Sequence, residues 1–285
     1  MRWLGVVLIA ATAGSMPAAA QQPPMPNDTG PAFLSRVRAA TDRYRDRSRA
    51  VLDGYRPIGG DFPGMGEHWI QIGTVFAARF SVEDPPVLEY ATIHGRPTLV
   101  GVAYALPLLE GERAPDFPSA NAWHQHMGTV EEETDLLTHT MTSHTTMDAS
   151  RLAMLHVWAW LPNPAGAFRA DNWALPFVRA GLAAPADDPG AVAGRVVSLV
   201  SGGDAFYASV FESLSGATRS DSVAIVNAVA RARVNATAWV AVSGARTADS
   251  EDLIRLRAIW ADMWRMLDST LGPGARGRLS SVRDR

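Results

Sequence analysis

The spacing of apolar residues changes twice along this 285-residue chain, and these changes restrict the folds that the chain can adopt. Short apolar runs rich in β-branched and aromatic residues occupy the middle third, as expected for strands. Beyond residue 190 the sequence is rich in Ala, and its apolar residues recur at the spacing of amphipathic helices. Strands and helices that are grouped separately along a chain are typical of α+β proteins. We therefore expect an α+β fold, with an antiparallel sheet in the middle third, an N-terminal helix and an Ala-rich helical C-terminal region.

The strands are predicted from apolar runs that are bounded by turn-forming residues. Two runs, LVGVAYAL and LAMLHVWAW, both lead up to a proline, which cannot donate a hydrogen bond within a sheet. The tripeptide His94-Gly95-Arg96 lies between two runs and predicts a hairpin connection, whereas Gly59–Gly66 is rich in turn formers. The predicted strands are roughly Trp69–Phe80, Val87–Ile93, Thr98–Leu106 and Leu152–Leu161.

Helices are predicted before and after the sheet. The first runs from Pro31 to about Gly54, and the last is bounded by a cap at Asp249 or Ser250 and by a stop at Gly272-Pro273. The C-terminal helices are expected at about 190–201, 204–216, 219–243 and 250–271. We accordingly divide the chain into an α+β domain (31–182), a helical region (190–271) and a Gly-, Ser- and Arg-rich tail (272–285) that is expected to be disordered.

The first 20 residues have the layout of a secretory signal peptide. Arg2 precedes an apolar run, and the small residues Ala18-Ala19-Ala20 end the segment. The run is shorter than the about 20 apolar residues that span a bilayer, which disfavours the alternative of an uncleaved anchor. We expect residues 1–20 to be a signal peptide, residues 21–30 to be a flexible leader, and the protein to be periplasmic or secreted without a stable membrane span after signal removal.

Composition excludes several classes of chemistry. The chain has no Cys, so it has no disulfides, thiolate metal ligands or cysteine nucleophiles. All 26 basic residues are Arg, which excludes a Schiff-base lysine and a P-loop lysine, and we expect no nucleotide cofactor. A net charge of −3 does not favour nucleic acid as a partner. A protein partner or a small ligand remains open.

Histidine and glutamate residues are the strongest candidates for a site. His68 follows Glu67 at the start of a predicted strand, and His156 lies inside the apolar run LAMLHVWAW, where a buried imidazole needs a partner. We expect these two histidines to share one site, with Glu67 or Glu89 as its carboxylate. A satisfied core histidine is the plainer alternative for His156.

A second histidine pair lies downstream, at His124 and His126. Residues i and i+2 of an extended strand face the same side, so both imidazoles could reach one ion. With Glu131 they form H-x-H-x4-E, which is similar to the first metal motif of cupins, although the upstream Gly and the second cupin motif are absent. Two exposed loop histidines are the alternative.

The segment from Glu131 to Met147 suggests a separate hypothesis, a copper site. Imidazole and thioether ligands together favour copper, so the protein could handle copper in the periplasm. A solvated Thr-rich loop is the alternative. The candidate copper ligands are His139, Met141, His144 and Met147.

Two motifs also resemble a known group of sequences. The order GMGEHW, a Pro-led strand to Tyr90, LVGVAY and LHVWAWLPNPAGAF resembles exported bacterial hypothetical proteins with a G-M-G-x-H-aromatic motif and a late L-H-x-W…N-P-x-G-x-F motif, over about residues 39–175. That group has no established activity, so the resemblance implies a shared site and no reaction. This chain has Ala91 where the pattern often has Glu. The marks of the group are His68, His156, Asn163, Pro164, Gly166 and Phe168.

These observations support three hypotheses. The leading one is a His/Glu metal site for a divalent ion (Zn, Cu, Fe or Mn), in which an open coordination position could activate water. The second is a non-metal binding or interaction module whose apolar pocket would be lined by Trp69, Trp158, Trp160 and Trp173. The third is the copper-handling reading. Whether the protein is an enzyme stays undecided at this point, because no G-x-S-x-G or H-E-x-x-H motif occurs. The candidate metal ligands are His68, His156, His124, His126, Glu67 and Glu89.

Overall fold

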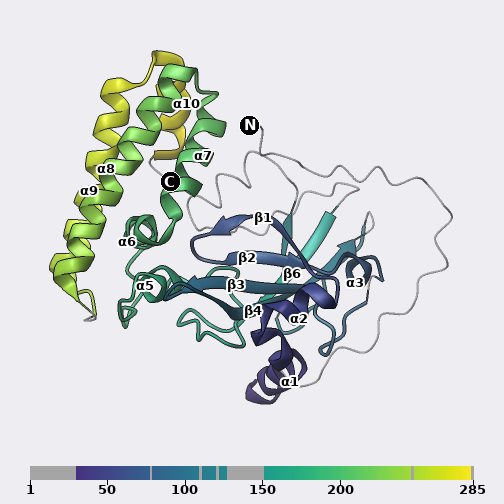
Figure 1. The fold of residues 1–285 in the computed structure, drawn as a ribbon. Helices are drawn as coiled ribbons and strands as arrows, with labels where there is room; N and C mark the ends of the chain where they lie inside the picture. Colours follow the sequence, from purple (N-terminus) through teal and green to yellow (C-terminus); the bar gives the residue numbers. More distant parts are fainter. Residues whose placement is uncertain are drawn as a thin grey trace.

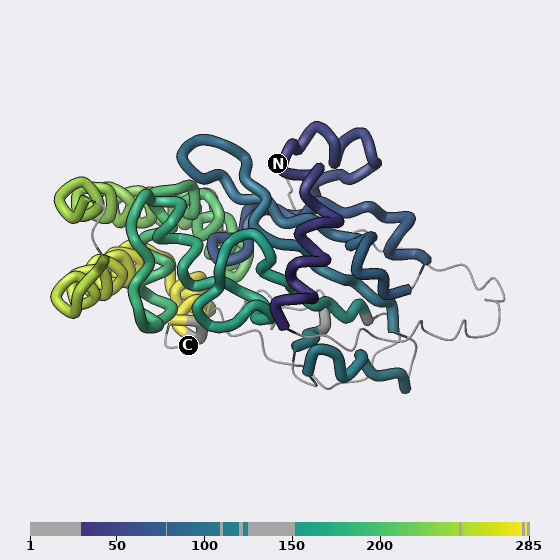
Figure 2. The backbone as a smooth tube through the Cα atoms, turned by 90° about the horizontal axis from the view of Figure 1, so that it is seen from below, coloured from purple at the N-terminus to yellow at the C-terminus, as the bar shows by residue number. Residues whose placement is uncertain are grey.

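The computed structural model describes residues 30–77, 79–108, 111–119, 122–126, 151–244 and 247–283. These residues form a six-stranded antiparallel sheet and a group of helices that lies beside it, which confirms the α+β expectation (Figures 1 and 2). The strand order in the sheet is β1-β2-β3-β4-β6-β5. The strands are β1 (Arg56–Phe62), β2 (Gly66–Ile70), β3 (Val87–Ile93), β4 (Arg96–Leu108), β5 (His124–His126) and β6 (Arg151–Val157).

The sheet follows the predicted runs in the main, although β6 ends at Val157 and not at Leu161, and β5 was not among the predicted strands. Two larger differences concern the segment after Ile70 and strand β1. The hairpin at His94-Gly95 is confirmed, and both residues have positive φ, as a two-residue hairpin turn requires. The predicted strand Trp69–Phe80 is wrong beyond Ile70, because the Gln71 side chain accepts a hydrogen bond from Thr74 N and starts helix α3 (Ile72–Phe76). Strand β1 was not predicted, since its two glycines read as a turn; in the structure they lie at a bulge between Ile58 and Asp61.

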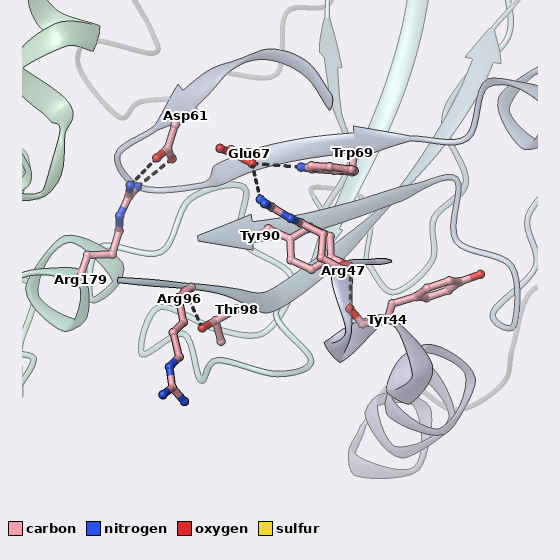
Figure 3. A network of polar contacts seen from close by, with 9 residues as sticks. All are labelled: Tyr44, Arg47, Asp61, Glu67, Trp69, Tyr90, Arg96, Thr98 and Arg179. Atoms are coloured by element: carbon pink, nitrogen blue, oxygen red, sulfur yellow. Dashed lines mark hydrogen bonds and ion pairs between the residues drawn. The ribbon is translucent and has the colours of Figure 1, made fainter. Parts of the chain in front are cut away.

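The N-terminal segment packs on one face of the sheet (Figure 2). It is not one continuous helix from Pro31 to Gly54. Asp46 is extended, and its carboxylate caps the next helix by accepting a hydrogen bond from Ser48 N. Phe33 is buried against the sheet, and the Tyr90 hydroxyl donates to Tyr44 O (Figure 3). The three pieces are α1 (Pro31–Thr41), the 3₁₀-helix η1 (Asp42–Arg45) and α2 (Arg47–Leu52).

The C-terminal helices agree well with their predicted bounds. Capping boxes at Thr218 and Asp249 begin the two longest helices, and their buried faces form an apolar core separate from that of the sheet. No helix among the described residues has both the length and the apolar character needed to cross a bilayer. The elements are α5 (Leu175–Arg179), α6 (Ala191–Ser198), η2 (Leu199–Ser201), α7 (Gly203–Ser215), α8 (Arg219–Ser243), α9 (Ser250–Thr270) and α10 (Pro273–Arg283).

Helix α10 corrects the expectation of a disordered tail. Ala275 and Leu279 are buried in the helical core, and Arg278 Nε donates to Ser215 O at 2.5 Å. The tail was read from its Gly, Ser and Arg content, but a helix needs only one apolar face to pack against a neighbour.

The helical region contacts the sheet at strand β1. Arg179 forms a bidentate ion pair with Asp61 (Figure 3). The centre of the Phe206 ring on α7 lies 5.6 Å from that of the Phe62 ring. The Arg179 side chain is nearly buried. A bidentate pair fixes the orientation of the guanidinium and the carboxylate as well as their distance, so it helps to set the position of the helices against the sheet.

The packing of α10 can be tested by truncating its buried leucine. Leu279→Ala is expected to lower the free energy of unfolding by about 2–4 kcal/mol, because the side chain is 1% exposed. Leu52→Ala, at a leucine that is 74% exposed, is the control and should change it by less than about 0.5 kcal/mol. Urea unfolding followed by circular dichroism measures both. Equal effects of the two substitutions would show that α10 does not pack.

Candidate metal centre

Strand register brings three ionisable side chains together on the face of the sheet opposite the N-terminal helices. His68 on β2 lies directly across from Glu89 on β3, and Glu89 lies across from Gly101 on β4. Further along β4, Ala103 lies across from His156 on β6. Because cross-strand partners point to the same face, His68, Glu89 and His156 converge over β4, whose residues there are small.

Gly101 makes room for the carboxylate. A Cβ at this position would lie 2.4 Å from Glu89 Oε2 and 2.9 Å from Val157 O, both closer than atoms can approach. A glycine inside a strand often marks such a close approach, so the run LVGVAY held a signal that the sequence interpretation did not use.

The three side chains present their potential ligand atoms to one another. One such atom from each of His68, Glu89 and His156 lies within 4.8 Å of the other two. His68 Nε2 is 3.8 Å from Glu89 Oε1, and His156 Nδ1 forms a close ion-pair contact with the same oxygen. The two imidazole rings are 5.4 Å apart and nearly perpendicular. Among the described residues, this is the group of His and acidic side chains that could hold a metal ion.

Burial of these three side chains makes a charge on any of them costly unless another group neutralises it. Glu89 and His156 are fully buried, and His68 is nearly so. Desolvation raises the pKa of Glu89 well above its ordinary value. Neither Glu89 oxygen accepts a well-formed hydrogen bond from the described residues. A buried carboxylate in this situation is stabilised by a proton, by a protonated imidazole or by a bound cation.

His124 and Phe62 enclose the triad. The His124 ring is buried and stacks on His156 at 4.9 Å with an interplanar angle of 19°. The Phe62 ring meets His68 edge-on at 5.7 Å, and Phe206 lies behind Phe62. The sequence interpretation missed both phenylalanines, because only the folded chain brings α7 to strand β1.

Glu67 is not part of the triad. It is adjacent to His68 in β2, so its side chain points to the other face. There it accepts a hydrogen bond from Trp69 Nε1 at 3.1 Å and pairs with Arg47 at 3.6 Å (Figure 3). Of the two carboxylates considered from the sequence, the structure brings Glu89 to the histidines.

The remaining sequence candidates are placed only in part. The backbone of His126 pairs with Leu152, and its side chain is not described. The extended pairing of β5 is the backbone geometry that the H-x-H spacing suggested. Glu131 and the candidate copper ligands His139, Met141, His144 and Met147 lie outside the described residues.

The tryptophans do not share a pocket. Trp69 belongs to the core beneath the N-terminal helices, whereas Trp158 belongs to a different apolar cluster and donates from Nε1 to Arg169 O. Trp160 packs on the same core as Trp69, and Trp173 is half-buried. Trp69 and Trp160 thus belong to one apolar core and Trp158 to another, so the four side chains do not line one pocket.

The two motifs that carry the resemblance meet in space. Asn172 N, just after the N-P-x-G-x-F loop, donates to Gly64 O in the G-M-G turn at 2.8 Å. Within the loop, Asn163 donates to Asp171 O and accepts from Ala165 N, and Phe168 packs on Phe33. These contacts brace the turn that leads into β2 and therefore His68.

Comparisons of the chain with family models, with curated proteins and with solved structures found no match.

The role of Gly101 can be tested by adding one methyl group. Gly101→Ala is expected to lower the free energy of unfolding by about 1–3 kcal/mol, because the new Cβ overlaps Glu89 and Val157 O. Gly60→Ala, where a Cβ meets nothing within 4 Å, is the control and should have a smaller effect. Urea unfolding at neutral pH gives both values. A tolerated Gly101→Ala would mean that Glu89 does not lie against this strand.

Proposed function

We propose that this protein is an exported metal-binding protein whose ion is held by His68, Glu89 and His156. The observation that carries the proposal is the convergence of two imidazoles and one carboxylate, all buried, with ligand atoms within 4.8 Å of one another. The export part rests on the signal-peptide layout of residues 1–20 alone.

The donor set suits a transition metal. Imidazole and carboxylate ligands bind Zn²⁺, and the same set suits Fe, Mn and Cu. Ligand atoms about 2.0–2.2 Å from a tetrahedral ion lie roughly 3.3–3.6 Å from one another. The 3.8 Å between His68 Nε2 and Glu89 Oε1 is close to that spacing, so small side-chain rotations would complete a site.

The environment of Glu89 also favours a cation. A carboxylate whose pKa is raised by burial loses its proton readily when a divalent ion takes the place of that proton. The ion would also satisfy the carboxylate oxygens, which lack well-formed hydrogen bonds from the described residues. Metal affinity should then fall at low pH, because protons compete for Glu89 and for both imidazoles.

Three protein ligands leave at least one coordination position for a further group. His124 stacks on His156, so it is close enough to orient the His156 imidazole or to rotate toward the ion itself. If water fills the position instead, the bound metal supplies Lewis-acid activation of that water. The three ligands are buried and Phe62 packs against His68, so little solvent reaches the position, which strengthens the electrostatic interactions within it.

The proposal is tested with tag-free, full-length protein and a matched pair of glutamates. Metal analysis should find about one transition-metal ion per chain, and Zn²⁺ or Mn²⁺ should raise the unfolding midpoint of chelator-treated protein. Glu89→Gln should weaken metal affinity at least about 100-fold. Glu67→Gln changes the neighbouring strand position on the opposite face and should leave affinity unchanged. Absence of saturable binding of Zn²⁺, Mn²⁺, Fe²⁺ and Cu²⁺ would refute the proposal, as would equal losses in both variants.

The histidines should differ in importance. His68→Ala and His156→Ala each remove a ligand, and binding should become undetectable at micromolar metal. His124→Ala removes a stacked neighbour and should cost about 10–100-fold in affinity. Isothermal titration of the chelator-treated variants measures this order. A His124→Ala variant as defective as His156→Ala would make His124 a direct ligand.

A further inference from the structure

Helix α6 carries a positive charge into the interior of the helical region. Arg195 is only 3% exposed. Its Nε is enclosed without a hydrogen-bond partner, and no ion pair joins its guanidinium to an acidic side chain among the described residues. The guanidinium carbon lies 5.6 Å from the centre of the Trp260 ring on α9, over its face. A cation–π contact offsets only part of the cost of burying a charge.

The groups around Arg195 are hydrogen-bond donors and aromatic rings. Tyr207 on α7 is fully buried, its ring lies 5.6 Å from that of Trp260, and its hydroxyl makes no well-formed hydrogen bond with the described residues. The Ser198 hydroxyl lies beside Tyr207 and donates to Arg195 O. Phe211 and Trp264 extend the aromatic wall.

Arg195 and Tyr207 are close enough that each affects the pKa of the other. Burial lowers the pKa of Arg195, while the nearby Tyr207 opposes that effect. Burial raises the pKa of Tyr207 to about 12, and the charge of Arg195 counteracts the rise. A guanidinium does not lose its proton in a protein, so the positive charge remains and calls for a negative partner.

Three carboxylates of the helical region that are buried or half-buried are engaged elsewhere. Asp204 pairs with Arg233. Asp221 accepts hydrogen bonds at the start of α8 and from Gly272 N, and Asp252 accepts from Trp239 Nε1. No carboxylate among the described residues pairs with Arg195, so a neutralising group would come from outside the described chain.

We infer that Arg195 and the Tyr207 hydroxyl form a buried binding site for one small monoanion, either a halide ion or the carboxylate of a small organic acid. One guanidinium supplies one positive charge, which a monoanion neutralises. A dianion would leave a net negative charge in an apolar interior, at a cost of several kcal/mol. The fork of Arg195 suits the two oxygens of a carboxylate, and the aromatic walls suit an acid with a short apolar chain. This site is independent of the proposed metal centre, since it belongs to the separate helical core.

The test uses the full-length chain and its unfolding midpoint at constant ionic strength. Sodium sulfate is replaced stepwise by sodium chloride in one series and by sodium acetate in another. Because sulfate stabilises folded proteins in general, the specific response is a saturable rise of the wild-type midpoint above the trend of Arg195→Met in at least one series, and the more effective anion identifies the ligand class. Arg195→Met keeps the length of the side chain and removes its charge, so its midpoint should show no saturable rise. Arg233→Met, at an exposed arginine of the same region, is the control and should keep the wild-type response.

A second variant keeps the inference testable if Arg195→Met does not fold. Tyr207→Phe preserves the packed ring and removes one donor, and it should weaken the apparent anion affinity about fivefold to tenfold. The inference is overturned if the wild type responds to neither anion. It is equally overturned if Arg195→Met and Tyr207→Phe both respond as the wild type does. Neither result depends on metal, because all series contain a chelator.

Discussion

The burial of the Glu89 carboxylate is the constraint around which the sheet is arranged. A charged group in a sheet interior costs several kcal/mol unless a proton or a cation neutralises it. Here the chain supplies one imidazole on the adjacent strand β2, a second on β6 across β4, and a glycine that gives the carboxylate room. The position of β4 between β3 and β6 sets the distance between the carboxylate and His156. The loop after β6 braces the turn before β2, and with it the start of the strand that carries His68.

Much of the fold could be predicted because its signals are local. The helices of the C-terminal third follow from apolar periodicity and from capping residues such as Thr218 and Asp249, which act within one turn. Strand β1 could not be predicted in this way, since its glycines are typical of a turn and only the pairing of their neighbours with β2 places them in a bulge within a strand. Helix α10 was missed because its stability comes from burying Leu279 against other helices, which composition does not reveal.

The site was predictable in its histidines and less so in its carboxylate. His68 and His156 stand out because a histidine in an apolar strand needs a partner. The choice between Glu67 and Glu89 depends on which face each occupies. Strand alternation already separates Glu67 from its neighbour His68, so that part could have been resolved from the sequence. Pairing His68 with Glu89 requires the register of β2 and β3, which arises from long-range contacts between strands.

The contact of Phe206 with Phe62, and of Phe62 with His68, has a kinetic meaning. The helical region closes over one side of the site through this pair of rings. For the proposed ion, release toward this side would require the packing between α7 and β1 to open, whatever its equilibrium affinity. The ion pair between Arg179 and Asp61 resists that opening, although it lies away from the histidines. The contacts between the helices and the sheet would thus help to set the residence time of the ion. Its binding strength would be set by the ligands on the strands.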